Sequence, residues 1–85
     1  MPRVHFRSED ERAIYRVWVG MHDRCRRTTH PMYHRYGGRG IKVCERWSTF
    51  ENFVDDMGAR PPGLTLERKD NDGPYAKWNC EWASN

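Results

Sequence analysis

Aromatic side chains in an otherwise very polar chain are the feature that most limits what this sequence can fold into. The 85 residues include four Trp, four Tyr and three Phe, although 32% of the residues are charged. A chain of this length buries only about 60–65% of its unfolded surface, so its core must come from a few large side chains. Disordered chains are poor in aromatic residues. We therefore expect one domain over residues 1–85, with an aromatic core, a polar shell and residues 1–7 as an extended arm.

Two segments have the pattern of amphipathic helices. Residues 8–11 (Ser-Glu-Asp-Glu) form a capping box, and the apolar residues after it return to one helical face, namely Ile14, Trp18, Met21 and Cys25. This pattern predicts a helix over about residues 9–26. Residues 48–51 (Ser-Thr-Phe-Glu) are a second capping box, and Gly58 suits the end of a helix. The second helix is therefore expected over about residues 49–57.

The remaining segments predict a loop and short strands. Residues 27–40 read as an extended loop, in which the Gly-Gly-Arg-Gly turn at 37–40 permits positive φ. Residues 41–44 are a candidate strand. Residues 64–68 alternate, the Asn-Asp-Gly-Pro segment at 71–74 is a turn signal, and residues 78–83 can return as a second strand. The expected fold class is α+β, with an N-terminal helix, a loop, a second short helix and a C-terminal β-hairpin.

Positive charge is concentrated in the first half of the chain. Residues 1–46 hold eleven Lys or Arg against five Asp or Glu, whereas residues 47–85 hold four against seven. Twelve of the fifteen basic residues are Arg, which binds phosphate with two N–H groups at once. Such a surface favours nucleic acid, with DNA preferred to RNA, and the alternative is a solvated face. The candidate contact residues are Arg24, Arg27, Arg35, Arg39, Lys42 and Arg68.

The cysteine count bears on the compartment. Three cysteines are an odd number, and the N-terminal segment is polar, with no evident signal peptide or membrane-spanning segment. We therefore expect reduced thiols, a cytoplasmic location and no membrane partner.

Several motifs together resemble a family of small, mostly phage-encoded proteins described as HNH-like and related to the ββα-metal (His-Me finger) endonucleases. The first motif is Tyr-Gly-Gly-Arg-Gly-Ile at 36–41, and the helix before it carries Trp-x-x-Met-x-x-Arg-Cys at 18–25. The second is Arg-x-Asp-Asn-Asp-Gly-x-Tyr at 68–75, followed by Asn-Cys-x-Trp at 79–82. The match covers about residues 15–83. It implies that the hairpin is a truncated ββα-metal core, that the ancestry is that of a nucleic-acid enzyme, and that the compartment is the host cytoplasm.

The same resemblance points to degenerate catalytic positions at Glu67, Arg68 and Asn79. Glu67-Arg68 matches the position of the family's Asp-His pair, in which the histidine is the base. A guanidinium stays protonated and is not a useful base, although it can hold a phosphate. Glu67 could supply an oxygen ligand to Mg²⁺. The family's metal-binding helix would follow Trp82, where this sequence has only Ala-Ser-Asn, so we expect binding without cleavage.

A zinc site is a separate possibility. Cys25, Cys44 and Cys80, together with a histidine such as His34, would supply four ligands of suitable chemistry. No Cys-x-x-Cys pair is present, and the alternative is three buried free thiols. His34 is also the best candidate for a substitute base.

Three functions therefore remain open from the sequence. The first is a nucleic-acid-binding protein of HNH descent. The second is an active, metal-dependent HNH-like endonuclease. The third is a phage inhibitor that binds a host defence protein, with the acidic second half as its docking face.

Overall fold

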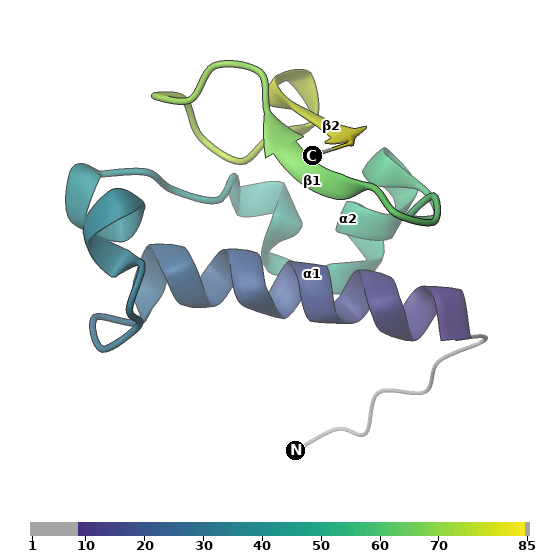
Figure 1. Cartoon of the computed structure of the whole chain (residues 1–85), viewed down its shortest axis with the longest axis horizontal. Helices are drawn as coiled ribbons and strands as arrows, with labels where there is room; N and C mark the ends of the chain where they lie inside the picture. Colours follow the sequence, from purple (N-terminus) through teal and green to yellow (C-terminus); the bar gives the residue numbers. More distant parts are fainter. Residues whose placement is uncertain (1–8, 85) are drawn as a thin grey trace.

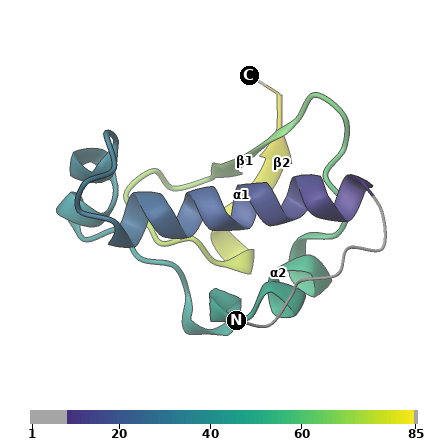
Figure 2. The same ribbon diagram turned by 90° about the horizontal axis from the view of Figure 1, so that it is seen from below.

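The computed structural model describes residues 9–84, which form two layers (Figures 1 and 2). Helix α1 (Glu9–Arg26) is one layer, and α2 (Phe50–Met57) and a two-stranded antiparallel hairpin lie on one side of it. The hairpin joins β1 (Thr65–Arg68) to β2 (Cys80–Ala83). Four short 3-10 turns connect these elements: η1 (Tyr33–Arg35), η2 (Gly37–Arg39), η3 (Glu45–Ser48) and η4 (Lys77–Asn79). The expected α+β class with a C-terminal hairpin is confirmed.

Helix α1 has the bounds that its apolar periodicity predicts. Ile14 and Met21 are buried against the second layer, and Trp18 and Cys25 on the same face are partly buried. Residues one helical turn apart share a face, so this stripe supplies much of the α1 side of the core, and Tyr15 and Val17 pack beside it. Ser8, which would cap this helix, and the expected arm at residues 1–7 lie outside the described residues.

Trp47 is the centre of the core. Its side chain is 0% exposed, and its ring meets the Phe53 ring edge to face, with the centroids 4.8 Å apart. Its Nε1 donates to Asp56 Oδ2 at 2.7 Å, and its carbonyl accepts from Trp18 Nε1 at 2.7 Å. The aromatic core is thus confirmed with one exception. Trp78, which we expected inside, is 67% exposed.

Helix α2 starts in a different way from the prediction. Ser48 belongs to η3, so the helix begins from Thr49, whose side chain makes no capping hydrogen bond. The predicted capping box at residues 48–51 is therefore wrong, because the chain is already wound into a 3-10 turn before the helix begins. The expected glycine cap is present: Gly58 has φ 67° and its N–H donates to the Val54 carbonyl at 2.8 Å.

The extended segments are shorter than the sequence suggests. The candidate strand at residues 41–44 is wrong, because it makes only a single parallel bridge, between Val43 and Tyr75. The second hairpin strand starts at Cys80 because residues 77–79 wind into η4. Within the hairpin Glu67 lies opposite Glu81 and Arg68 lies opposite Cys80. The expected loop at residues 27–40 contains η1 and η2, which pack against the C-terminal half of α1 (Figure 1).

Candidate functional site

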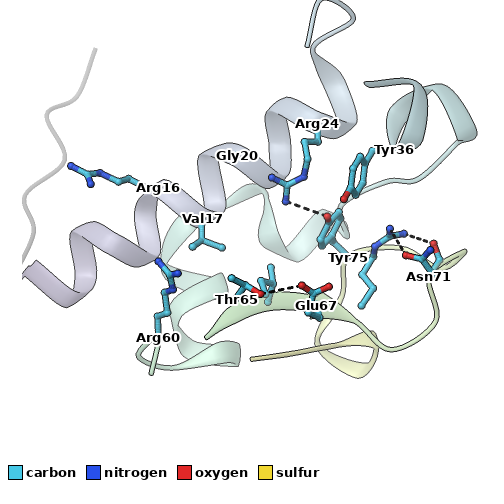
Figure 3. Close-up of a pocket in the computed structure, with 12 residues that line it drawn as sticks. Arg16, Val17, Gly20, Arg24, Tyr36, Arg60, Thr65, Glu67, Asn71 and Tyr75 are labelled. Atoms are coloured by element: carbon cyan, nitrogen blue, oxygen red, sulfur yellow. Dashed lines mark hydrogen bonds between the residues drawn. The ribbon is translucent and has the colours of Figure 1, made fainter. Parts of the chain in front are cut away.

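A cleft of about 340 Å³ lies between α1 and the hairpin (Figure 3). We call it the arginine cleft, because four of its lining residues are arginines and only one is acidic. It is lined by Arg16, Val17, Gly20 and Arg24 from α1, by Tyr36 and Arg60 from loops, by Thr65, Leu66, Glu67 and Arg68 from β1, and by Asn71 and Tyr75 from the hairpin loop.

Two tyrosines and two arginines form the end of this cleft. The rings of Tyr36 and Tyr75 are 6.2 Å apart and inclined by only 20°. The guanidinium carbon of Arg24 lies 5.1 Å from the Tyr36 centroid and 5.8 Å from that of Tyr75. The guanidinium carbon of Arg68 lies 5.2 and 5.1 Å from the same two centroids. Cation–π contacts of this kind hold a guanidinium in place without neutralising it.

Arg24 is held but keeps most of its donors. Its Nη2 donates to the Tyr75 hydroxyl at 3.2 Å, and its Nε is buried without a hydrogen-bond partner among the described residues. Burial raises the pKa of the Tyr75 hydroxyl, so the group stays neutral near pH 7 and accepts this hydrogen bond. Arg24 therefore brings a fixed positive charge to the cleft.

Arg68, by contrast, is largely committed to its own loop. Nη1 donates to the carbonyls of Asn71 and Gly73 at 2.8 and 2.9 Å, and Nη2 donates to Asn71 Oδ1 at 3.1 Å. A guanidinium has five N–H donors, so most of this one is used within the hairpin. Arg68 contributes charge to the cleft, and its hydrogen bonds order the loop at residues 69–74.

Asn79 is also a loop-ordering residue. Its side chain is buried, and its Oδ1 accepts from the Asp70 N–H at 2.9 Å. Its Nδ2 donates to the carbonyls of Asp70 and Pro74 at 3.1 and 2.9 Å. Asp70 turns the loop further, because its Oδ1 accepts from the Asp72 N–H at 3.0 Å. Of the three degenerate catalytic positions, only Glu67 and Arg68 line the cleft, and Asn79 lies beneath the loop.

Glu67 is exposed on β1 and extends toward the cleft (Figure 3). Its Oε1 accepts from Thr65 Oγ1 at 3.0 Å. The Glu67 carboxylate lies in the same cleft as the four arginines. Its negative charge would repel an anion that binds there.

A second hollow of about 530 Å³ adjoins the arginine cleft. It shares Tyr36, Arg68 and Asn71 with the cleft, and its other lining residues are His34, Arg35 and Arg39. Arg39 is tied to the hairpin loop, because its Nη1 pairs with Asp72 at 2.9 Å and its Nη2 donates to the Asn71 carbonyl. Arg35 and His34 are exposed.

The glycines before Ile41 allow the turn beside this hollow to pack closely against the end of α1. A Cβ on Gly37 would overlap the carbonyl of Cys25, so only glycine allows the turn to approach the helix this closely. Of the three glycines in the turn, only Gly40 has a positive φ, at 86°. The predicted conformational role is therefore right at Gly40 alone, and Gly37 is required for close packing instead.

The four residues of the suggested zinc site do not converge. Cys25 lines a separate hollow with Arg26, Lys42 and Val43, whereas His34 lines the second hollow. Across residues 9–84 no three His, Cys, Asp or Glu side chains are grouped closely enough to hold a metal ion. Burial raises the pKa of all three thiols, that of Cys80 to about 11, so they stay protonated near pH 7.

The expected nucleic-acid contacts are thus only partly brought together. Arg24 and Arg68 line the cleft, and Arg35 and Arg39 line the second hollow. Lys42 lines the separate hollow beside Cys25, and Arg27 is exposed just after α1 ends. Two arginines of the cleft, Arg16 and Arg60, were not among the contacts expected from the sequence. Arg16 lies two turns before Arg24 on the helix, a spacing that could have identified it, but Arg60 carries no such signal.

Comparison with protein-family models, with curated proteins and with solved structures gave no match to this chain. A separate finding concerns membranes: no helix in residues 9–84 has both the length and the apolar character needed to span a bilayer.

Proposed function

We propose that this protein binds nucleic acid through the arginine cleft, and that it is of HNH-like descent without phosphodiester cleavage. One observation carries the proposal: four arginines and a single acidic residue line one cleft between α1 and β1. Arginine is the side chain best suited to phosphate oxygens, because its planar fork matches them with two hydrogen bonds.

The availability of these groups supports the proposal. Arg16 is exposed and donates no hydrogen bond to any residue in the described part of the chain, and Arg60 uses only Nε, which donates to the Leu64 carbonyl. The described ion pairs join Arg39 to Asp72 and Arg46 to Asp56, so among residues 11–84 no carboxylate forms an ion pair with an α1 arginine of the cleft. When positive groups without a fixed counterion contact phosphates, they displace the salt cations that are condensed on the nucleic acid.

Arg68 supports the absence of cleavage. It stands where the resembled enzymes have their base, and its guanidinium cannot accept a proton near neutral pH. Its donors hold the loop carbonyls of Asn71 and Gly73, which is a structural task.

The test is a titration of labelled duplex and single-stranded DNA with the protein at several salt concentrations. We expect Arg16→Gln to weaken binding and to reduce the slope of log K against log salt by the change for one phosphate contact, which is about 0.9 for duplex and about 0.7 for single-stranded DNA. Arg26→Gln is the matched control, because Arg26 is an exposed arginine of the same helix that lines other hollows. Absence of binding to either DNA form at micromolar protein refutes the proposal, as does an equal loss in both variants.

Glu67 favours one second candidate, a metal-dependent endonuclease, because a carboxylate beside a phosphate-binding group could serve as a Mg²⁺ ligand. Nicking of a supercoiled plasmid in the presence of Mg²⁺, Mn²⁺ or Ni²⁺ tests this candidate. Glu67→Gln separates the two functions. For a protein that only binds, the variant should hold DNA more tightly, because it removes a negative charge from the cleft. For a nuclease, it should abolish nicking.

A further inference from the structure

The aromatic rings of the candidate site are already occupied. Tyr36 and Tyr75 are near-parallel neighbours, and both Arg24 and Arg68 lie over the two rings at 5.1–5.8 Å. Tyr75 is only 3% exposed. Proteins that read bases on single strands do so by offering open aromatic faces. Here the partners of the two rings are guanidinium groups and each other.

Of the two amide side chains near the cleft, that of Asn79 is fully used within the protein and that of Asn71 is used through its oxygen. Asn and Gln are the side chains that most often read adenine edges with two hydrogen bonds. Asn71 Oδ1 accepts from Arg68, and the Asn79 side chain is buried in bonds to the hairpin loop. The free hydrogen-bonding capacity of the site is therefore concentrated on guanidinium groups.

The two hollows lie side by side with common walls. Arg68, Tyr36 and Asn71 line both of them, so each side of Arg68 opens onto a hollow that carries cations. Arg16, Arg24 and Arg60 border the first, and Arg35 and Arg39 border the second. Two adjoining cationic hollows suit a polymer with successive phosphate groups better than they suit a single phosphate.

We infer that the site recognises the sugar-phosphate backbone alone, with neighbouring phosphates of one strand held in the two hollows and no base in contact. This inference rests on the proposed function and specifies its ligand class: any nucleic-acid strand, irrespective of base sequence. The tyrosines then act as positioning residues for Arg24 and Arg68, without touching the ligand.

The experiment compares two fluorescein-labelled oligomers of about 12 nucleotides, long enough to fill a typical single-strand site. One is oligothymidylate, and the other has the same deoxyribose-phosphate backbone with every base removed. We expect the intact protein to bind the two with dissociation constants within about threefold of each other. Each base stacked on an aromatic ring ordinarily contributes several-fold to affinity, so a base-reading site would lose far more.

The outcomes distinguish the two proposals. A loss of tenfold or more for the abasic strand overturns the inference but leaves nucleic-acid binding in place. Failure to bind either oligomer also overturns the inference, and it overturns nucleic-acid binding as well if the duplex DNA of the first titration is not bound. The second hollow has its own test: Arg35→Gln should reduce the salt slope for both single-stranded oligomers by about 0.7, as Arg16→Gln does, and Arg26→Gln should not. An unchanged slope in Arg35→Gln overturns the assignment of a phosphate to the second hollow.

Discussion

Removing the Asn79 side chain should destabilise this protein far more than its single uncharged side chain suggests. Asn79 is 1% exposed, and its three hydrogen bonds close the loop that connects β1 and β2. In Asn79→Ala the carbonyl of Asp70 keeps one donor, because the Gly73 N–H also bonds to it at 3.0 Å. The Asp70 N–H and the Pro74 carbonyl lose the partner that Asn79 provides.

The magnitude follows from these two groups. An unsatisfied buried donor or acceptor costs about 1–3 kcal/mol, and partial access of water to the exposed loop reduces that cost. We expect a loss of about 2–4 kcal/mol in the free energy of unfolding. A domain of 85 residues has a total of about 4–13 kcal/mol, so the loss is a large share of its stability. The melting temperature should fall by about 4–8 °C for each kcal/mol.

Urea denaturation followed by tryptophan fluorescence measures this change, because Trp47 is fully buried and reports on the core. Asn71→Ala is the control in the same loop: Asn71 is exposed, its side chain accepts one bond from Arg68, and its loss should cost under about 1 kcal/mol. Asn79→Asp keeps the side-chain shape but replaces the Nδ2 donor with an anionic oxygen that faces two carbonyls. If Asn79→Asp is as stable as the wild type, or if Asn79→Ala costs no more than Asn71→Ala, the hydrogen-bond argument is refuted.

Two further predictions concern the packing of α1 and its pH dependence. Burial lowers the pKa of His22, whose Nε2 bonds to the Trp47 carbonyl at 2.9 Å while its buried Nδ1 lacks a partner in the described chain. Protonation therefore favours the unfolded chain, so the stability contributed by neutral His22 is present above a pH of about 6.5 and is lost as the pH falls below it. Between about pH 7 and 5, urea titrations should show a smaller loss of stability for His22→Gln than for the wild type; equal losses contradict this assignment. Gly37→Ala should cost about 1–3 kcal/mol, because the new methyl group overlaps a backbone carbonyl of α1, whereas Gly38→Ala meets its nearest atom at 3.1 Å and should cost less. Thermal unfolding of the two variants checks the difference. If Gly38→Ala is the less stable variant, the close approach of Gly37 to α1 is not what requires a glycine in this turn.

Local pattern predicted the bounds of both helices to within about one residue, but it did not predict how the second helix is capped. The periodicity of Ile14, Trp18, Met21 and Cys25 is enough to place α1, because a helical face is set by residues within one segment. The predicted capping box of α2 was wrong because η3 takes up Ser48, and that turn contains the buried Trp47. The candidate strand at residues 41–44 was wrong for a similar reason, since a strand needs a partner and this segment meets only Tyr75.

The sequence also predicted the positive charge of the candidate site better than it predicted which residues line that site. An excess of arginine in the first half predicted a cationic surface, and Arg24, one of the candidate contact residues, lines the cleft. Arg60 was missed because it reaches the cleft from a loop far along the chain. Arg39 and Arg68 were read as contacts with a ligand, whereas most of their hydrogen bonds are made to the hairpin loop.

By itself, the sequence determined the α+β class, the aromatic core, the first helix and the hairpin, because each depends on side-chain spacing within a short segment. The tertiary structure alone decided which arginines share a cleft, that Asn79 orders a loop, and that the cysteines and His34 lie apart. Those features join residues as far apart as Arg24 and Tyr75, whose distance is set by how the hairpin packs on α1. A linear pattern cannot specify that packing, because the same basic residues could equally have been distributed around the whole surface.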